Sequence, residues 1–223
     1  CSVVVSDLAQ EACEAVVSGL GVGSNGGPGH LALAADVRSE EAVTELVAQT
    51  VAKYEKLDIL VASAGVLRAP DSGPMPLARL SAEEWDFVIG VNLRGMFLCN
   101  REAAKMMIRQ RGGDIVNISS VSGLHGRAND APYCASKFGV MGMTESLAEE
   151  VRGQGVRVQV VLPDAVNTPI WEQNGPVPMP VDALPPERVA DLVLTMVCLP
   201  PDTVLGGTVI APFKTRRRKS KEK

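Results

Sequence analysis

A tyrosine and a lysine four residues apart constrain this chain more than any other feature of its sequence. They occur in the stretch Tyr133-Cys134-Ala135-Ser136-Lys137, which predicts a helix. Helical residues four apart project from the same face, so an ammonium group lies one turn from a phenol. Because a nearby cation favours the phenolate, we expect the pKa of Tyr133 to fall from its usual value of about 10. Taken alone, this spacing is common on helices and usually carries no function.

The residues before this pair give it a context. Gly113–Ile118 is a short apolar stretch that predicts a strand, and it runs into Ser119 and Ser120, while Asn92 lies further upstream. The ordered set resembles the Asn, Ser, Tyr, Lys tetrad of the short-chain dehydrogenase/reductase family, and the gap between Ser120 and Tyr133 also matches. The resemblance runs over essentially the whole chain. It implies an α/β fold: a Rossmann-like, doubly wound parallel sheet in three layers, α/β/α.

The resemblance also implies a role for each tetrad residue. Tyr133 exchanges a proton with the substrate oxygen, Ser120 hydrogen-bonds that oxygen, and Lys137 lowers the tyrosine pKa and holds the nicotinamide ribose. Asn92 accommodates a local helix distortion and holds a water that links Lys137 to solvent. Read without the resemblance, an asparagine in mid-helix would only lower helix propensity.

Asp7 is the residue on which we base the expected cofactor. It ends a β-branched stretch, Ser2–Ser6, so it is either the N-cap of the following helix or a carboxylate that binds the adenosine ribose hydroxyls. The resemblance favours the second reading. A carboxylate there would repel a 2'-phosphate, so we expect NAD(H), with NADP(H) possible. The other cofactor contacts that the resemblance implies are Leu8, Asp36, Val37, Ser63, Ala64, Gly65, Ile118, Tyr133, Lys137, Pro163, Val166 and Thr168.

Two positions depart from the family pattern. Ser63 stands where the family has Asn, so we expect some sheet-stabilising contact to be lost. Asp164 replaces the Gly of a Pro-Gly-x-Val-x-Thr turn, which costs a modest amount of energy if that turn requires a positive φ.

The family begins with a strand, a Gly-rich turn and a helix, and this chain has none of them ahead of Asp7. In the family order the missing strand lies between the predicted strands Val3–Val5 and Ile59–Val61. We therefore expect both strands to have an unpaired edge, and residues 1–223 to bind dinucleotide weakly and to be less stable than a chain with that strand. Direct pairing of the two strands with each other would contradict this expectation.

Composition indicates one folded domain. The 223 residues are 46% hydrophobic and 22% charged, enough for a single well-buried α/β domain over residues 1–212 that is N-terminally incomplete. Apolar runs stay well below the ~20 residues of a membrane span, and no signal-peptide pattern opens the sequence. The five cysteines are scattered without metal-ligand spacing. We expect free thiols, no metal and a cytoplasmic location, with neither a membrane nor nucleic acid as a partner.

The charge is unevenly distributed. Residues 213–223 contain seven Lys and Arg and one Glu, a net +6, which leaves −10 for the rest of a chain whose total is −4. Such a tail can bind nucleic acid or an acidic partner, but more often it is a solvated, disordered end, and we expect the latter. Gly21–Gly29 lies between a helix and a strand, the wrong context for phosphate binding, so it predicts a surface loop.

These features predict an NAD(H)-dependent enzyme that interconverts a secondary alcohol and a ketone, such as a carbonyl reductase or a 3-oxoacyl thioester reductase. The alternative is a catalytically silent scaffold with the same fold. The segments Val121–Ala131 and Ile170–Pro186 should border the substrate, the first with Ser122, His125 and Asn129 as its polar candidates. We also expect a homo-oligomer, a tetramer or a dimer. The predicted helix Tyr133–Val151 supports this because its apolar residues, Phe138, Met141, Met143 and Leu147, cannot all face one sheet.

Overall fold

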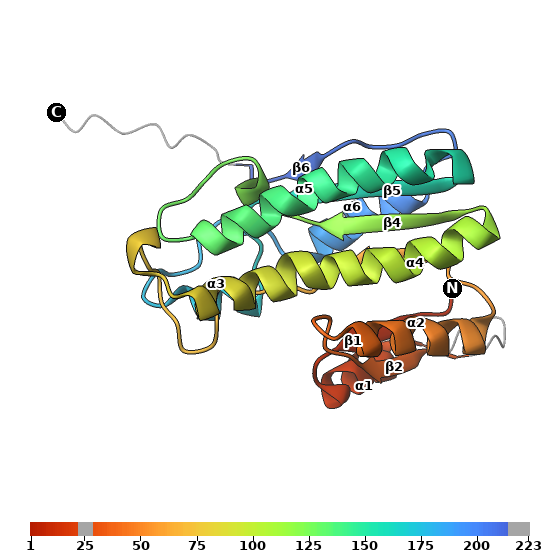
Figure 1. Cartoon of the computed structure of the whole chain (residues 1–223), viewed down its shortest axis with the longest axis horizontal. Helices are drawn as coiled ribbons and strands as arrows, with labels where there is room; N and C mark the ends of the chain where they lie inside the picture. The colour runs from red at the N-terminus through yellow and green to blue at the C-terminus, as the bar shows by residue number, and fades with distance from the viewer. Residues whose placement is uncertain (22–28, 214–223) are drawn as a thin grey trace.

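A computed structural model of the chain describes residues 1–21 and 29–213. Its strands are short, all of their pairings are parallel, and they form two sheets of order β1-β2 and β3-β4-β5-β6. Helices follow most strands, as the alternation of apolar and helical stretches predicts (Figure 1). The strands are β1 (Val4–Asp7), β2 (Leu31–Ala34), β3 (Ile59–Ala62), β4 (Gly113–Ile118), β5 (Val156–Pro163) and β6 (Thr208–Ile210).

The strands β1 and β3 belong to different sheets and do not pair with each other. Each is therefore an edge strand with one row of unpaired backbone groups within the described part of the chain. On β3, Leu60 and Ala62 pack into the core, whereas Ile59 and Val61 are 42% and 44% exposed. The direct pairing that would have contradicted the sequence-based expectation is not present.

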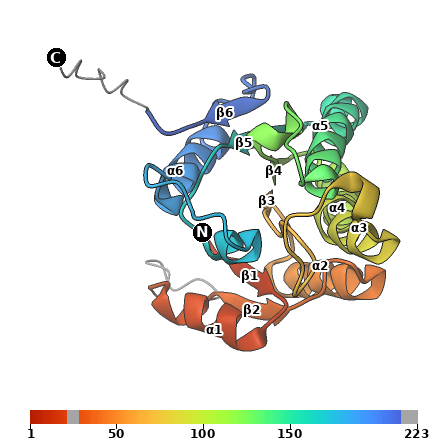
Figure 2. The same ribbon diagram turned by 90° about the vertical axis from the view of Figure 1, so that its left-hand side faces the viewer.

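Helices cover both faces of the strands. Figure 2 looks along the strands and shows α2, α4 and α5 on one side of the row, with α1 and α6 on the other. The arrangement confirms the three-layer Rossmann-like architecture. The helices are α1 (Gln10–Gly19), α2 (Glu40–Tyr54), α3 (Ala82–Ile89), α4 (Met96–Gln110), α5 (Ala131–Val151) and α6 (Pro186–Val197), and the short 3-10 helices are η1 (Leu77–Arg79), η3 (Val121–Gly123), η4 (Arg152–Gln154) and η5 (Pro169–Asn174).

The core follows the alternation of side chains along β4 and β5. Ile115 and Val158 point to one face, where they pack against α4 and α5. Val116 and Val161 point to the other face, where Met196 of α6 covers them. Because both faces are covered, most side chains of these two strands are buried, including the polar Asn117 and Gln159, as expected for a buried parallel sheet.

Local signals in the sequence set the helix starts. Ser39 Oγ accepts a hydrogen bond from the Ala42 backbone N–H at the start of α2. At the start of α3, Ser81 and Glu84 form a capping box, in which each side chain binds the other's backbone N–H. Asp7, by contrast, does not cap α1: the N-cap position is Ala9, two residues later.

Two predicted segments lie mostly outside the residues that the structure describes. Residues 22–28 of the predicted Gly-rich loop and residues 214–223 of the basic tail lie outside the described residues. All five cysteines carry free thiols. Among the described helices, none is long and apolar enough to cross a membrane.

Candidate active site

Ser120 and Tyr133 come from adjoining elements. Ser120 follows β4, and its Oγ accepts a hydrogen bond from the Ser122 N–H as the chain turns into η3. Tyr133 lies in the first turn of α5, and its phenol is close enough to the Ser120 side chain for that hydroxyl to affect its pKa. A second contact fixes α5 on the end of β4, because Ser119 Oγ donates to the Lys137 backbone oxygen at 3.0 Å. The structure thus brings the predicted proton donor and the predicted substrate-binding hydroxyl together.

The pKa of Tyr133 shifts in the direction opposite to the one that the sequence predicts. Burial raises it above 10, and the hydrogen bond with Ser120 and the positive charge of Arg127 only partly oppose this effect. The sequence-based expectation of a lowered tyrosine pKa was therefore wrong for this structure. Helical spacing places a lysine near the phenol, but it carries no information about how much water the phenol loses.

Lys137 explains part of this difference. Its side chain is buried, and burial lowers the pKa of its ammonium group to about 8. Lys137 Nζ donates to the Ile118 carbonyl oxygen at 2.9 Å and lies 5.7 Å from the centroid of the Tyr133 ring. At the pH above 10 at which the phenol would ionise, a lysine with a pKa of about 8 is already neutral, so it adds no positive charge that would lower the pKa of Tyr133.

Asn92 lies where a helix departs from α geometry. The chain continues from α3 into a π-helical segment, η2 (Gly90–Gly95), and from there into α4. A π-helical turn contains an extra residue and often occurs at functional sites. Asn92 is fully buried, and its amide accepts from the Val66 N–H and donates to the Val66 oxygen, both at 2.8 Å, and to Ser136 Oγ at 3.1 Å. The local distortion that the resemblance implies is therefore present.

Gly65 lies between two members of the tetrad. A Cβ atom on this glycine would be 3.5 Å from Asn92 Oδ1 and 3.7 Å from Lys137 Nζ. The loop after β3 thus runs directly past both side chains. Together with the contacts of Ser120 and Tyr133, this places all four predicted tetrad residues around the carboxyl ends of β3 and β4.

The predicted cofactor residues also lie at the carboxyl ends of strands, which is where ligands bind in open parallel sheets. Asp7 and Leu8 are exposed at the end of β1, as are Ser63 and Ala64 after β3. The side chains directly after β3 are small, and among the described residues the Asp7 carboxylate makes one weak contact, with the Ala9 N–H at 3.4 Å. These residues fit a nicotinamide dinucleotide that runs along the edge.

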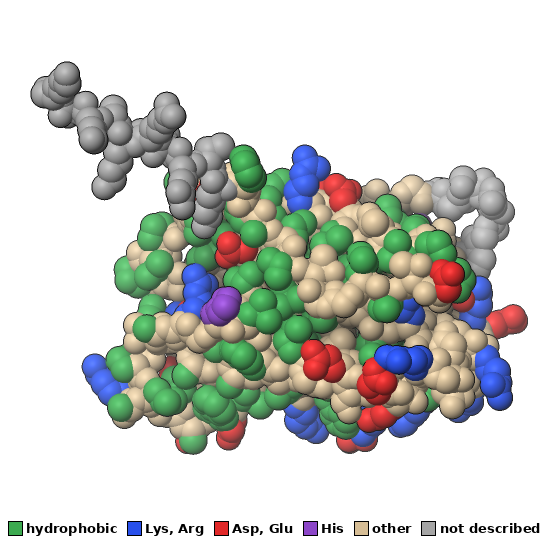
Figure 3. Space-filling model, turned by 90° about the horizontal axis from the view of Figure 1, so that it is seen from above, with side chains coloured by type: hydrophobic (Ala, Val, Ile, Leu, Met, Phe, Trp, Pro, Cys, Tyr) green, Lys and Arg blue, Asp and Glu red, His purple; other side chains and the backbone are tan. Residues whose placement is uncertain are grey.

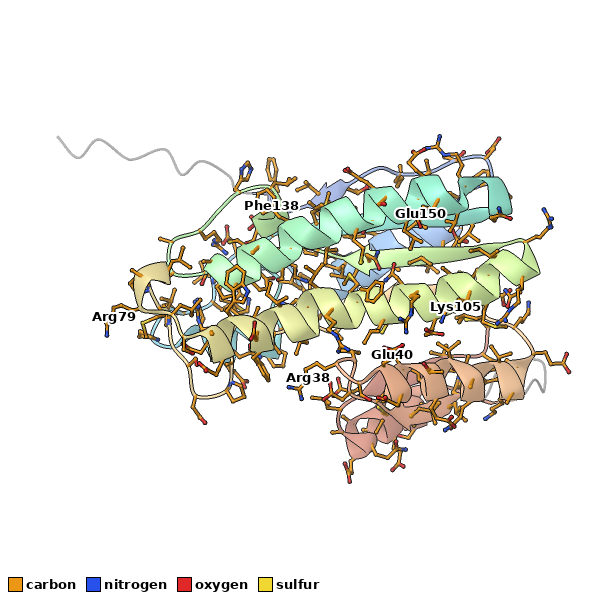
Figure 4. The ribbon with its side chains drawn as sticks, viewed as in Figure 1. Arg38, Glu40, Arg79, Lys105, Phe138 and Glu150 are labelled. Atoms are coloured by element: carbon orange, nitrogen blue, oxygen red, sulfur yellow. The ribbon has the colours of Figure 1, made fainter. Side chains whose placement is uncertain are left out.

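Asp36 and Val37, which follow β2, are held by their neighbours. The hydrogen-bonded guanidinium of Arg38 holds the pKa of Asp36 below its usual value, and the two groups form an ion pair at 2.6 Å. Val37 packs so closely on η2 that a Cβ on Gly95 would be 2.6 Å from it. Arg38 lies just before α2, near Glu40 (Figure 4), and its guanidinium is 5.2 Å from the centroid of the Phe87 ring of α3.

The segment after β5 carries the remaining predicted residues. Pro163 is buried at the end of the strand, and Asp164 has no positive φ, so its replacement of the family glycine causes no strain. Val166 forms an isolated bridge with Leu184, and Thr168 is the N-cap residue of η5. Trp171 of η5 donates from its indole to the Val166 oxygen at 2.7 Å, which fixes the segment to the end of the sheet.

The three polar residues predicted in the Val121–Ala131 loop differ in burial and in backbone conformation. Ser122 is buried, and its Oγ has no hydrogen-bond partner among the described residues. His125 is exposed. Asn129 has φ of 65°, a left-handed conformation that is uncommon outside glycine.

Sequence reasoning missed a buried cluster beside this site. It consists of Arg68, Asp130, Gln173 and Asn174, which come from three separate segments of the chain. No motif marks them, and the contacts join residues that are 62 to 106 positions apart. The sequence shows an arginine in a predicted loop, but it does not show that this arginine is buried.

The parallel α/β architecture and the polar cluster at its carboxyl edge are the features of a Rossmann-like oxidoreductase. Comparison with known proteins agrees: the model of the short chain dehydrogenase family matches residues 1–177. The chain belongs to this family, whose members are oxidoreductases that act on CH–OH groups with NAD or NADP.

Curated relatives share this class. The chain is 36% identical to a 3-oxoacyl-[acyl-carrier-protein] reductase of Thermotoga maritima over 173 residues, 77% of this chain and 67% of the relative. It is 38% identical over 172 residues to a (2S)-[(R)-hydroxy(phenyl)methyl]succinyl-CoA dehydrogenase subunit of Thauera aromatica, with 77% and 66% covered. The matched segment thus spans about two thirds of these relatives.

Solved structures extend the likeness to most of the fold. A metagenomic short-chain oxidoreductase in complex with NADP superposes with a TM-score of 0.77 at 28% identity, covering 95% of this chain and 86% of that one. Levodione reductase superposes with a TM-score of 0.81 at 26% identity, with 93% and 84% covered.

Proposed function

We propose that this protein is an NAD(H)-dependent oxidoreductase that interconverts a ketone and a secondary alcohol, with Tyr133 as the general acid and base. The observation that carries the proposal is the convergence of Ser120, Tyr133 and Lys137 at one strand end. The Ser120 side chain is close enough to the Tyr133 phenol to affect its pKa, and Lys137 Nζ lies 5.7 Å from the centroid of the Tyr133 ring.

The protonated phenol of Tyr133 suits carbonyl reduction. A tyrosine whose pKa lies above 10 is protonated at neutral pH, so Tyr133 can give its proton to a carbonyl oxygen as that oxygen gains negative charge. The Ser120 hydroxyl can donate a hydrogen bond to the same oxygen and so hold it beside the phenol. A bound nicotinamide dinucleotide supplies the hydride in this direction and accepts it in the reverse one.

Lys137 and Asn92 support these groups. The Lys137 ammonium, held at the Ile118 carbonyl, would hydrogen-bond the nicotinamide ribose hydroxyls. Asn92 fixes the loop that contains Gly65 and Val66, the backbone that a cofactor would pass. Asp7, exposed at the end of β1, would accept hydrogen bonds from the adenosine ribose, which favours NAD(H) over NADP(H).

A 3-oxoacyl thioester is the first substrate to test. Curated relatives that are 36% to 42% identical to this chain are 3-oxoacyl-[acyl-carrier-protein] reductases, and the relative from Thauera aromatica is named for a CoA thioester. These names motivate the choice of compound, since the loops of this chain carry no signature of a particular ketone.

The test follows oxidation of the reduced cofactor with a 3-oxoacyl thioester and with simple ketones. Tyr133→Phe should lower kcat by about 10²–10⁴-fold, because general acid catalysis contributes that much, and should leave NADH binding nearly unchanged. Tyr54→Phe is the matched control, since among the described residues the Tyr54 hydroxyl, at the end of α2, bonds the Gly29 oxygen. Turnover above half of the wild-type value in Tyr133→Phe would refute the assignment.

The absence of turnover and of NADH binding in a protein that includes the Gly-rich strand, turn and helix of the family would instead favour a catalytically silent scaffold. Titration of intrinsic fluorescence with NADH separates these outcomes, because cofactor binding can be detected without any substrate.

A further inference from the structure

Arg68 is a buried charged residue that the proposed chemistry does not use. It follows β3 by six residues, and its side chain is 7% exposed. The guanidinium donates to three acceptors: the Asn129 carbonyl at 3.0 Å, Asp130 Oδ1 at 2.5 Å and Asn174 Oδ1 at 3.1 Å. Arginine is suited to this task because its rigid fork binds several acceptors in fixed directions.

Two of these acceptors lie at the start of the catalytic helix. Asp130 directly precedes α5, and its carbonyl accepts the first helical hydrogen bond, from the Cys134 N–H at 2.9 Å. Asn129 adopts a left-handed conformation that needs support from its surroundings. Arg68 therefore holds both residues that set where α5 begins, three and four positions before Tyr133.

The third acceptor belongs to η5, the segment beside the predicted substrate region. Asn174 is the last residue of η5, and a second contact reinforces this link. The side-chain oxygen of Gln173 accepts from the backbone N–H of Leu67 at 2.7 Å and of Arg68 at 3.2 Å. The η5 segment is thus attached to the loop after β3 through both a side chain and the backbone.

The ion pair alone does not account for this arrangement. A buried ion pair adds little to stability relative to apolar residues of the same volume, because desolvation of both charges offsets their attraction. Asp130 would satisfy the charge of Arg68 by itself. The contacts with Asn129 and Asn174 instead join two segments whose relative position matters for a substrate at Tyr133.

We propose that Arg68 is a positioning residue that couples η5 to the first turn of α5, so that the seating of η5 and the placement of the Tyr133 phenol occur together. The catalytic part of this inference rests on the proposed function, whereas the coupling of the two segments does not.

The coupling is tested by the fluorescence of Trp171, which lies in η5. Trp85 is the other tryptophan, so Trp85→Phe leaves Trp171 as the sole reporter. In that background, Asp130→Asn weakens the ion pair on the α5 side of Arg68, far from the indole in sequence. We expect it to increase the quenching of Trp171 by acrylamide, and to have no further effect once Arg68→Met is present.

Arg68→Lys provides a second variant in case Arg68→Met does not fold, because lysine keeps the charge but cannot reach three acceptors. Arg188→Met, which removes an exposed arginine of α6, is the matched control. Circular dichroism verifies folding. Quenching of Trp171 that is unchanged in folded Asp130→Asn and Arg68→Lys proteins would overturn the proposal.

The catalytic part is tested by steady-state kinetics. A displaced proton donor should lower kcat by roughly 10- to 100-fold, as misplacement by about 1 Å does, with a smaller change in KM. An increase in quenching with kcat unchanged would overturn the role of Arg68 in placing Tyr133. A wild-type protein without turnover would remove the proposed function, while the quenching experiment would still decide whether Arg68 couples the segments.

Discussion

The side chain of Asn92 forms two hydrogen bonds with the backbone of Val66. The Asn92 amide accepts from the Val66 N–H and donates to the Val66 oxygen, both at 2.8 Å, so one side chain satisfies both backbone polar groups of Val66. The same amide reaches Ser136 of α5. One residue of the π-helical segment therefore fixes the loop after β3 and contacts the helix that carries Tyr133 and Lys137.

Loss of these hydrogen bonds should lower the free energy of unfolding. Asn92→Ala leaves the Val66 N–H and carbonyl without their partner, and each unsatisfied buried group costs about 1–3 kcal/mol. We expect the free energy of unfolding to fall by about 2–4 kcal/mol in urea titrations. Asn167→Ala, at an exposed position after β5, is the control and should change it by less than about 0.5 kcal/mol. Similar values for the two variants would contradict the structural role of Asn92.

Gly123 marks a close approach between η3 and α5. A Cβ at this position would be 2.8 Å from the Lys137 carbonyl oxygen and 2.8 Å from Ser119 Oγ. Since the carbonyl belongs to the helix backbone, Gly123→Ala must displace α5 and should lower the free energy of unfolding by about 1–3 kcal/mol. In thermal unfolding, Gly126→Ala should be nearly neutral, because nothing lies within 4 Å of its Cβ. Equal melting temperatures for both variants would disprove this contact.

Burial of Lys137 makes stability depend on pH in a defined window. Its pKa is about 8 in the folded protein and 10.5 when solvated. Between these values the unfolded chain binds more protons than the folded one, so stability rises with pH. Below pH 8 both states are protonated and the cost of burying the charge is constant.

Comparison with Lys137→Met isolates this effect. The free energy of unfolding of the wild type, relative to that variant, should increase from pH 8 to pH 10 and stay level between pH 6 and pH 7. The half-exposed Lys105 offers a control, Lys105→Met, for the loss of a lysine. An equally large pH dependence in the control would show that burial of Lys137 is not the cause.

Asp7 should determine the choice of cofactor. Its carboxylate at the end of β1 would repel a 2'-phosphate, so Asp7→Ser should raise the ratio of kcat/KM for NADPH to that for NADH by about tenfold, equivalent to about 1.4 kcal/mol. Asp58→Ser, at the opposite end of the strands, should leave the ratio unchanged. If the wild type uses both cofactors equally well, the assigned role of Asp7 is wrong.

The outer face of α5 should contact another copy of this chain. Met141, Met143 and Leu147 pack against the core, whereas Phe138 is 46% exposed. It lies on the outer side of α5 (Figure 4), and Figure 3 shows hydrophobic side chains gathered on the face that contains this helix. We expect a homo-oligomer in light scattering at micromolar concentration, and a smaller particle for Phe138→Lys. Leu194→Lys, at an exposed position of α6, should not change the mass. A monomeric wild type would refute this prediction.

The sequence by itself determined the features that depend on neighbouring residues. The spacing of Tyr133 and Lys137 fixed their common helical face, and Ser39 and Ser81 marked helix starts because capping needs only the next three residues. Apolar stretches ending in polar residues located the strands to within a few residues. The order of Asn92, Ser120, Tyr133 and Lys137 was enough to predict the family and the parallel α/β fold.

Tertiary structure decided what depends on distant contacts and on loss of water. The pKa of Tyr133 rises because surrounding atoms exclude solvent, an effect that helical spacing does not encode. The cluster around Arg68 joins segments up to 106 residues apart, and only the packed fold brings them within hydrogen-bond distance. Local geometry is fixed by covalent connection, whereas burial and long-range pairing arise only when the whole chain is folded.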